Sequence, residues 1–532
     1  MLSSHFPILF AMPELIRDNA TLPPSLAGKI FPEIGSEQEK ELFRHLQANF
    51  MPQFENAFPD VLAHKTVVVV PSLTLDQEIL QKIEGIVHYE ERLLCLLMLL
   101  RMPRTHVVFV SSVPIDPVII DYYLHMLPGI TGYHARNRLT LLSCFDASPR
   151  SLTEKILERP RLVDRIRQSI PHGHLAHLAC FNVTRFERTL AVLLHLPIYG
   201  CDPDLYPLGN KSNGRQLFRE CGLTVPDGEE NLENEQDIAA ALLTLKNRNP
   251  NLRKAVVKIN EGFSGEGNAI FVYPDEDAGF DQILAELPLR LRIVANDLSF
   301  AGFMAKFIDA GGIVEAFIDG DQKHSPSVQC RITPLGVCHV ISTHDQELGG
   351  ESGQVFLGAH FPAKADYAKA LGDMGKTVGD ALCEKGALGR FGIDFISVKE
   401  PEGWKHYAIE INLRKGGTTH PYLMLDYLTQ GHYHADEGIY HMANGQSRFY
   451  FSSDNLRDAC YRGLTPHDLI DIAMVHELRY DGSTQEGVVF HLIGALSQYG
   501  KLEVVCIGDS KEKAESYFNR TVEVLGKECG RC

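Results

Sequence analysis

The sequence predicts an α/β protein built from more than one domain. Its 532 residues are 44% hydrophobic and 22% charged, which is ordinary globular composition and enough chain for roughly two to four compact cores. The first part of the chain alternates short apolar runs with longer helix-like segments, an order typical of a parallel sheet covered by helices. A second α/β region runs from about Asp204 to about Gln430, and a mixed segment follows.

Charge and hydropathy exclude two kinds of partner. The formal net charge of −17 argues against a general affinity for nucleic acid, because phosphate backbones are bound by surplus lysine and arginine. The longest near-continuous apolar run, Leu93 to Leu100, is too short to cross a bilayer of roughly 30 Å. The N-terminus lacks the layout of a signal peptide. We therefore expect no nucleic-acid partner, no membrane partner and a cytoplasmic protein.

The N-terminal region contains three predicted strands and two predicted helices. The apolar runs predict strands that begin at Lys65, at Thr105 and at Arg138. Residues 84–102 predict a helix by their length and composition. Ser151 and Glu154, three residues apart, form a capping-box signature that starts the next helix.

A glycine-rich loop separates two apolar runs between Lys254 and Tyr273. Glycine lets backbone N–H groups approach an anion closely, and Ser264 can add a hydroxyl donor. Both flanking runs are of β type, so the predicted unit is a strand–loop–strand hairpin with Lys258 at its mouth. The dinucleotide fingerprint and the P-loop both need a helix after the glycines, and none is signalled. A phosphate-binding loop and a plain hairpin turn both remain open at this point.

A second pattern predicts a magnesium site. Glu410 and Asn412 alternate with isoleucines, so both lie on one face of a strand. Paired oxygen ligands of this kind suit Mg²⁺, which keeps part of its coordination for phosphates and water. Arg414 follows in the same direction and can hold a phosphate or carboxylate. Asp394 interrupts another apolar strand, where a metal or a pairing with Arg390 would offset the cost of burial.

The two motifs "NEGFSGEGN" and "IEINLRKGGTTHP" together resemble the ATP-grasp superfamily of carboxylate–amine ligases, and within it the pheganomycin-type peptide ligases. The resemblance covers nearly the whole chain. It implies a pre-ATP-grasp, Rossmann-like domain over 1–203, an ATP-grasp domain over 204–434 and a C-terminal α/β extension over 435–532.

The resemblance also implies a set of site residues. For ATP it implies the phosphate lysines Lys211 and Lys258, the loop residues Ser264, Gly265, Glu266 and Gly267, and the adenine-binding hinge Glu315, Ala316, Phe317 and Ile318. For Mg²⁺ it implies Asp394, Glu410 and Asn412. For catalysis it implies Lys258, Arg414 and a further phosphate contact from Arg331. One departure is visible: many of these ligases carry an arginine two residues before the first metal aspartate, where this chain has Gly392.

The implied reaction is an ATP-dependent joining of a carboxylate to an amine or peptide. The carboxylate attacks the γ-phosphate to give an acyl phosphate and ADP, and the amine then forms the amide and releases phosphate. Phosphoryl transfer depends on positioning and charge neutralisation more than on a protein nucleophile. An ATP-grasp phosphotransferase and a non-catalytic ATP-binding protein are the alternatives.

The C-terminal segment is predicted to be folded, with a helix over 465–476 and a strand from Lys501 that leads into a loop. In the resembling ligases this extension accompanies the core, so it is expected to bind the peptide acceptor or to shape a homodimer. A simple packing role is the alternative.

Overall fold

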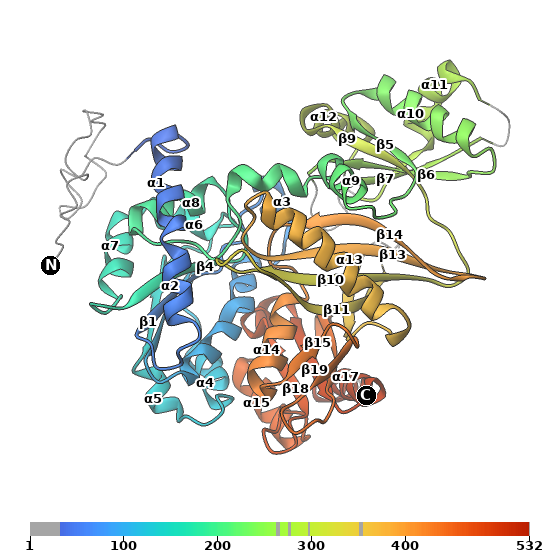
Figure 1. Ribbon diagram of the computed structural model, residues 1–532. Coiled ribbons are helices and arrows are strands. Elements are labelled where there is room, and N and C mark those ends of the chain that lie inside the picture. The colour runs from blue at the N-terminus through green and yellow to red at the C-terminus, as the bar shows by residue number, and fades with distance from the viewer. Residues whose placement is uncertain (1–31, 262–266, 275–277, 296–297, 350–354, 531–532) are drawn as a thin grey trace.

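The computed structural model describes residues 32–261, 267–274, 278–295, 298–349 and 355–530. Three larger sheets and one two-stranded sheet organise these residues. Figure 1 shows the N-terminal domain on one side of the central sheet and the five-stranded sheet above the long strands of the central sheet. Among the described residues, no helix is long and apolar enough to span a membrane.

The N-terminal domain contains a parallel sheet with the strand order β3-β2-β1-β4. Its strands are β1 (Lys65–Val70), β2 (Thr105–Ser111), β3 (Leu139–Ser143) and β4 (Leu175–Cys180). The three strands predicted from the sequence are confirmed as β1, β2 and β3. Strand β1 is buried along its whole length, as expected for a strand covered on both faces.

Helices cover both faces of this sheet. Core contacts on one face come from α1 (Glu37–Ala48), α6 (Leu152–Leu157), α7 (Pro160–Gln168) and α8 (Arg185–Leu194). On the other face lie η2 (Ile86–Arg101) and α4 (Pro117–His125). The other helices of this region are α2 (Phe50–Ala57), α3 (Gln77–Lys82), α5 (Gly132–Arg136) and η3 (Pro203–Gly209). Ser151 caps α6 by accepting from the backbone N–H of Glu154, as the capping signature predicts, and the helix expected over 84–102 is a 3₁₀ helix.

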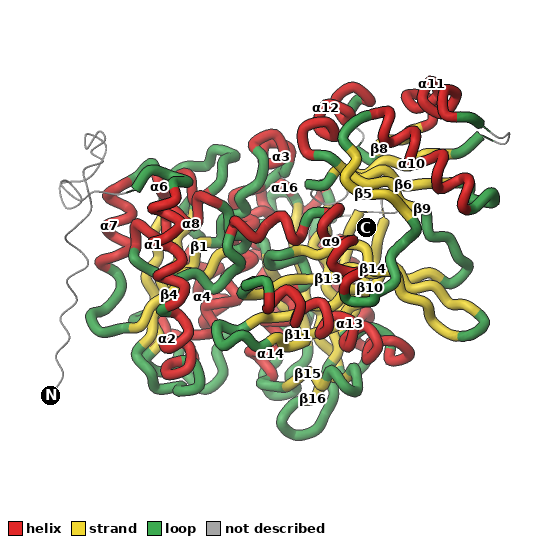
Figure 2. Tube along the Cα trace, turned by 45° about the horizontal axis from the view of Figure 1, so that its top comes forward, coloured by secondary structure: helices red, strands yellow, loops and turns green. Residues whose placement is uncertain are grey.

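The second sheet is antiparallel with the order β5-β9-β6-β7-β8. Its strands are β5 (Gly228–Leu232), β6 (Lys254–Ile259), β7 (Asn268–Val272), β8 (Leu291–Ile293) and β9 (Gly312–Ala316). The predicted hairpin is confirmed, because β6 and β7 pair antiparallel with Lys258 opposite Asn268. Helices α10 (Glu235–Arg248), α11 (Phe280–Arg290) and α12 (Phe300–Ala310) pack on the sheet face turned away from the long central strands (Figures 1 and 2).

The third sheet has eight strands in the order β14-β13-β10-β11-β12-β17-β19-β18. Its first five strands are β10 (Lys323–Ile332), β11 (Cys338–Gly349), β12 (Val355–Phe361), β13 (Gly389–Glu400) and β14 (Gly403–Asn412). Helix α13 (Ala365–Glu384) packs on one face, and α14 (Thr419–Thr429) follows β14. A two-stranded sheet comes next, made of β15 (His432–His434) and β16 (Ile439–His441).

The C-terminal segment continues the central sheet. Strand β17 pairs with β12, with Ser452 opposite Ala359, so hydrogen bonding crosses the predicted boundary at residue 434. The segment comprises β17 (Phe449–Arg457), η4 (Ala459–Tyr461), α15 (Pro466–Val475), β18 (Gly487–His491), η5 (Ile493–Ala495), α16 (Leu496–Tyr499), β19 (Lys501–Gly508) and α17 (Lys511–Glu528). The domain boundaries at 203/204 and 434/435 stay predictions.

One sequence interpretation of this segment is wrong. The stretch after β19 was expected to be a loop, but it forms α17, an 18-residue helix. Ser510 caps the helix by accepting from the N–H of Lys513, and Ala514, Thr521, Val524 and Leu525 lie buried at helical spacing. The many charged residues of the stretch occupy the solvent side of an amphipathic helix.

Candidate active site

Lys211 and Lys258, the two lysines expected to bind phosphate, are buried and lie beside carboxylates. Lys211 is the first residue of α9 (Lys211–Glu220), and its Nζ lies 3.3 Å from Oε1 of Glu410 on β14. The Nζ of Lys258 lies 2.6 Å from Oε2 of Glu315 on β9. Burial alone would raise the pKa of Glu410, but the charges of Lys211 and Lys258 lower it. Both lysines therefore act on the same region between the second and third sheets.

Strand alternation explains where Lys258 points. Ala255, Val257 and Ile259 belong to the core beneath α10, α11 and α12. Because successive side chains point to opposite faces, Lys258 projects from the other face, toward β13 and β14. Glu315 shares that face, since Val314 beside it packs in the same core.

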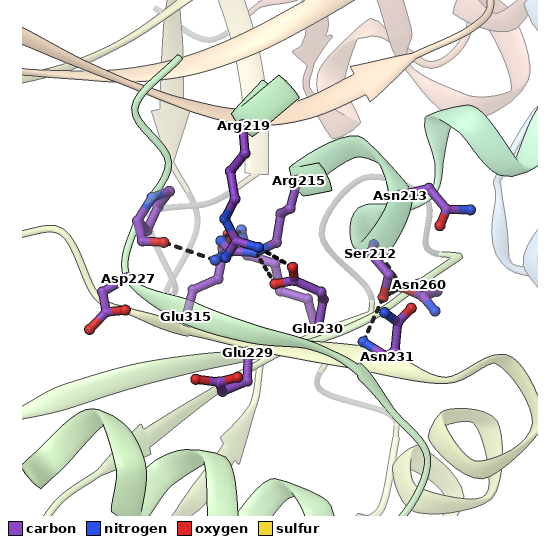
Figure 3. Close-up of polar contacts among 12 residues, drawn as sticks. Ser212, Asn213, Arg215, Arg219, Asp227, Glu229, Glu230, Asn231, Asn260 and Glu315 are labelled. Carbon is purple, nitrogen blue, oxygen red and sulfur yellow. Dashed lines mark hydrogen bonds and ion pairs between the residues drawn. The ribbon is translucent and has the colours of Figure 1, made fainter. Parts of the chain in front are cut away.

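A hydrogen-bond network joins the start of α9 to the end of β6. Oδ1 of Asn260 accepts from the backbone N–H of Ser212 at 3.0 Å and from its hydroxyl at 2.7 Å. The Ser212 hydroxyl oxygen also accepts from the N–H of Asn231 at 3.1 Å. Figure 3 shows these three residues together. Since Lys211 precedes Ser212 and Lys258 lies two residues before Asn260, the network fixes the spacing between the two lysines.

Glu315 is the centre of a second, ionic network. Its side chain is fully buried and binds Lys258 through one oxygen and the guanidinium of Arg215 through the other. Arg215 also donates to Glu230 at 3.2 Å and to the carbonyl of Pro226 at 3.0 Å (Figure 3). Burial would raise the pKa of Glu315, but the charges of Lys258 and Arg215 lower it. Glu315 is therefore ionised and serves as the counter-ion of both cations.

We expect Glu315→Gln to destabilise the protein by about 3 to 5 kcal/mol, because it leaves two buried cations without their shared counter-charge. Chemical denaturation followed by circular dichroism measures this. Glu229→Gln is the matched control, since Glu229 is more exposed and pairs with the exposed Arg248 at 2.7 Å. The control should lie within about 0.5 kcal/mol of the parent. Equal stability of the two variants would contradict a buried ionic centre at Glu315.

The three predicted metal ligands converge on one face of the central sheet. Asp394 on β13 lies directly opposite Glu410 on β14, and Gly392 lies opposite Asn412. The amide of Asn412 donates to Oδ2 of Asp394 at 2.9 Å. The amide of Gln346 on β11 donates to Oδ1 at 2.7 Å. The alternative partner Arg390 lies opposite Arg331 on β10 and makes no ion pair with Asp394 among the described residues.

The electrostatics of this face suit a divalent cation. Burial and the neighbouring charge of Glu410 raise the pKa of Asp394 to about 6. Two carboxylates side by side on a half-buried surface repel each other, and a hard cation with oxygen ligands relieves that repulsion. Within the described residues, no group of three or more His, Cys, Asp or Glu is arranged to hold a metal. A cation here would therefore need the amide oxygen of Asn412 and ligands from outside the protein.

The raised pKa of Asp394 predicts a pH-dependent loss of stability. Well below pH 4 this carboxyl is protonated in both states, whereas above about pH 6 the folded state must carry a charge that burial disfavours. Asp394→Asn lacks this penalty, so its stability relative to the parent should rise by roughly 2 to 3 kcal/mol between pH 4 and pH 7. Denaturant titrations across that range measure the slope.

A constant offset between Asp394→Asn and the parent at every pH would contradict the raised pKa. Asp380→Asn is the control, because Asp380 on α13 is about half exposed. It should differ from the parent by no more than about 0.5 kcal/mol over the whole range.

The other predicted site residues are Arg414, the residues of the adenine hinge, the glycine-rich loop and Arg331, and they do not all lie at the metal face. Arg414 follows β14, and its charge lowers the pKa of both Asp394 and Glu410. The N–H groups of Ala316 and Phe317 donate to Asp227 and Lys254, so adenine recognition there is left to other backbone groups. Gly267 accepts from the N–H of Ile259. Ser264, Gly265 and Glu266 lie outside the described residues.

Arg331 and Arg390 line a cavity that is separate from this site. The predicted metal ligands are not part of the wall of that cavity.

Sequence reasoning missed three residues that organise this site: Arg215, Asn260 and Gln346. Asn260 stands at the start of the quoted glycine-rich motif, so its position beside the phosphate lysine was a usable signal. Gln346 lies within β11. Arg215 sits one helical turn after Lys211 and carries no signal in a single sequence.

Two protein-family models match the chain. An ATP-grasp model described as IQCH-like matches residues 282–436. A model of the PGM1 C-terminal domain matches residues 468–521. The first match contains the strands that carry Asp394, Glu410 and Asn412.

Two solved structures with bound nucleotides superpose on most of the chain. A biotin carboxylase from Campylobacter jejuni in complex with β-γ-ATP has a TM-score of 0.53 and 11% identity, over 88% of this chain and 95% of that one. The biotin carboxylase domain of the Hydrogenobacter thermophilus 2-oxoglutarate carboxylase, with MgADP, has a TM-score of 0.52 and 12% identity, over 86% and 89%.

The chain has an ATP-grasp fold. The ATP-grasp resemblance and the α/β fold class expected from the sequence are thereby confirmed. At these identities the superposed structures establish the ATP-grasp architecture alone.

Two curated relatives match the sequence of the chain. The L-propargylglycine–L-glutamate ligase of Streptantibioticus cattleyicolor is 28% identical over 472 residues, which are 86% of this chain and 94% of the ligase. IQ motif-containing protein H of Danio rerio is 23% identical over 399 residues, which are 66% of this chain and 38% of that protein. The match therefore covers most of this chain and most of the ligase, whereas it covers 38% of the Danio rerio protein.

Proposed function

We propose that this ATP-grasp protein is an ATP-dependent carboxylate–amine ligase that forms an amide bond through an acyl phosphate and releases ADP and phosphate. The observation that carries the proposal is the grouping of Lys211, Lys258 and Arg414 around the carboxylates of Glu410 and Asp394. The similarity to a ligase that joins two amino acids, which covers 86% of this chain, supports the same reaction class.

In this proposal the cations of the chain position ATP and spread its charge. The ammonium groups of Lys211 and Lys258 lie at hydrogen-bond distance from the carboxylates of Glu410 and Glu315. Each ammonium group therefore needs only a small movement to contact a phosphate oxygen, or it can contact the carboxylate and the phosphate oxygen together. Arg414 faces the charge that develops on the transferring phosphoryl group and on the acyl phosphate. The Ser212–Asn260 network keeps both lysines at a fixed spacing during transfer.

Asp394, Glu410 and Asn412 would hold Mg²⁺, which supplies charge neutralisation at the phosphates when bound. The donor set fits a hard cation, because it offers two carboxylates and an amide oxygen on one sheet face. Gln346 and Asn412 orient Asp394 by donating to its two oxygens. The proposed compartment is the cytoplasm, where ATP and Mg²⁺ are supplied.

Amine-dependent release of ADP tests the function. The purified protein is incubated with ATP, Mg²⁺ and pairs drawn from panels of carboxylates and amines, and ADP and the coupled product are measured by enzyme assay and mass spectrometry. A ligase turns over ATP repeatedly only with both partners and yields one amide for each ADP. ADP release with a phosphorylated acceptor and no amide would identify a phosphotransferase, and ATP binding without any turnover would identify a non-catalytic protein.

A further inference from the structure

A cavity of about 500 Å³ lies between α13, α14 and the β15–β16 hairpin, beside the stretch of β11 that does not pair with β12. Figure 1 shows these elements around the same end of the central sheet. Two arginines, Arg331 on β10 and Arg390 on β13, lie in the wall of this space, and we call it the arginine cavity. Tyr422 and Asp426 of α14 line it as well. Its volume is that of a small-molecule site.

The two arginines form a like-charge pair that the described protein does not neutralise. Arg331 and Arg390 are direct cross-strand partners, so their side chains leave the same face a few ångströms apart. Like charges in this arrangement are destabilising. Neither guanidinium has a carboxylate within ion-pair distance among the described residues, although Asp426 lies close enough for its pKa to be affected by both.

Both guanidinium groups also carry buried nitrogen atoms without a partner. Nε of Arg331 and Nη1 of Arg390 are inaccessible to solvent and make no hydrogen bond within the described structure. Leaving a buried donor unpaired is costly, and more so when the donor is charged, so such donors call for an acceptor. The planar fork of an arginine is matched by a carboxylate or a phosphate, which can accept from two nitrogens at once.

Asp426 in the wall favours a carboxylate with an adjacent positive charge over a phosphate. Asp426 faces the same space, and burial raises its pKa while Arg390, Arg101 and Arg331 oppose that rise. A phosphate dianion would bring a second negative charge beside this carboxyl, whereas an ammonium group next to the ligand's carboxylate would be attracted to it. The lysine and one acid at the rim are already paired, Lys376 with Asp380 at 2.6 Å and Asp373 with Lys369 at 2.7 Å.

We propose that the arginine cavity binds the head group of a free α-amino acid, with its carboxylate on Arg331 and Arg390 and its ammonium group toward Asp426. The site is distinct from the proposed phosphate site, although it shares a sheet face with it. Ser327 is the partner of Asp394, and Arg331 and Arg390 lie four positions along, about 13 Å at strand spacing. Arg331 is then a ligand-binding residue of this cavity instead of a phosphate contact.

Isothermal titration without ATP tests the site, so the result does not depend on the proposed ligase activity. The twenty common amino acids and inorganic phosphate are titrated into the parent protein, and the best ligand is then compared with its methyl ester. We expect one or a few amino acids to bind, the ester to bind at least tenfold more weakly, and phosphate not to compete. Esters that bind as well as the acids, or the absence of any amino-acid binding, would overturn the proposal.

Variants locate the binding. Arg331→Gln and Arg390→Gln should each weaken the best amino acid at least tenfold, and Arg390→Lys should restore part of the affinity because it keeps the charge but loses the fork. Lys376→Gln is the matched control, since Lys376 lines the same cavity but is neutralised by Asp380. Thermal unfolding checks that each variant is folded, and the ester comparison stands if one is not. Parental affinity in both folded Gln variants would place the ligand elsewhere.

A second measurement, the ADP-release assay with the amino acid that binds, identifies the role of the ligand. If the amino acid that binds also supports ADP release, the cavity holds the head group of a substrate. If it binds with the same dependence on Arg331 and Arg390 but is not consumed, the cavity is a separate site on the enzyme. Failure of the ligase assay alone leaves the titration result intact, so the two proposals fail independently.

Discussion

Lys258→Ala is expected to lower ATP turnover by about 10³-fold or more, because the variant loses a buried point charge aimed at the phosphates. The fold should survive, since Glu315 keeps its ion pair with Arg215 when Lys258 is removed. The effect belongs to the chemical step as well as to binding, so it should persist at saturating ATP. ADP release at saturating ATP and substrates, with circular dichroism as the check on folding, measures it.

Lys306→Ala is the control for Lys258→Ala. Lys306 belongs to α12 of the same small sheet domain, its side chain is 42% exposed, and it pairs with Glu78 at 3.2 Å. Its removal should leave turnover unchanged, since exposed pairs of this kind contribute little. Parental turnover in folded Lys258→Ala would remove Lys258 from the reaction and weaken the whole assignment of the phosphate site.

Local signals in the sequence predicted most of the elements that carry the site. The β6–β7 hairpin followed from two apolar runs around glycines, and the shared face of Glu410 and Asn412 followed from their spacing of two. The start of α6 followed from Ser151 and Glu154. These predictions succeeded because each depends on residues that are neighbours in the chain.

Contacts between distant segments could not be predicted in the same way. Arg215 and Glu315 are 100 residues apart, and their ion pair exists only because α9 packs beside β9 in the folded protein. Gln346 reaches Asp394 across β10, which one sequence cannot foresee. The C-terminal extension was expected to accompany the core, but its hydrogen bonding to β12 makes it part of the central sheet. Its charged helix α17 was mistaken for a loop because polar composition outweighed the sparse buried positions.

The metal face gives the other large effect. Glu410→Gln should lower ADP release by about 10² to 10³-fold, because it keeps the shape of the side chain but removes a charge that a hard cation needs. ATP affinity should fall much less, since Lys211 and Lys258 remain. The pH profile gives an independent signature: Glu410 helps to hold the pKa of Asp394 near 6, so its neutralisation should move the acid limb of the residual activity to lower pH.

Two comparisons make this result specific to the metal face. Glu400→Gln is the charge-matched control, because Glu400 is the last residue of β13, its side chain is 45% exposed, and it pairs with Lys405 at 3.7 Å. This variant should keep the turnover and the pH profile of the parent.

Arg414→Ala leaves both carboxylates in place and removes a group aimed at charge that develops during transfer, so it should lower kcat more than ATP affinity. Since Arg414 lowers the pKa of Asp394, its loss should also move the acid limb to higher pH, opposite to the shift in Glu410→Gln. Shifts in the same direction, or parental turnover of Glu410→Gln with Mg²⁺, would show that Asp394 and Glu410 do not form one electrostatic unit at the site of phosphoryl transfer.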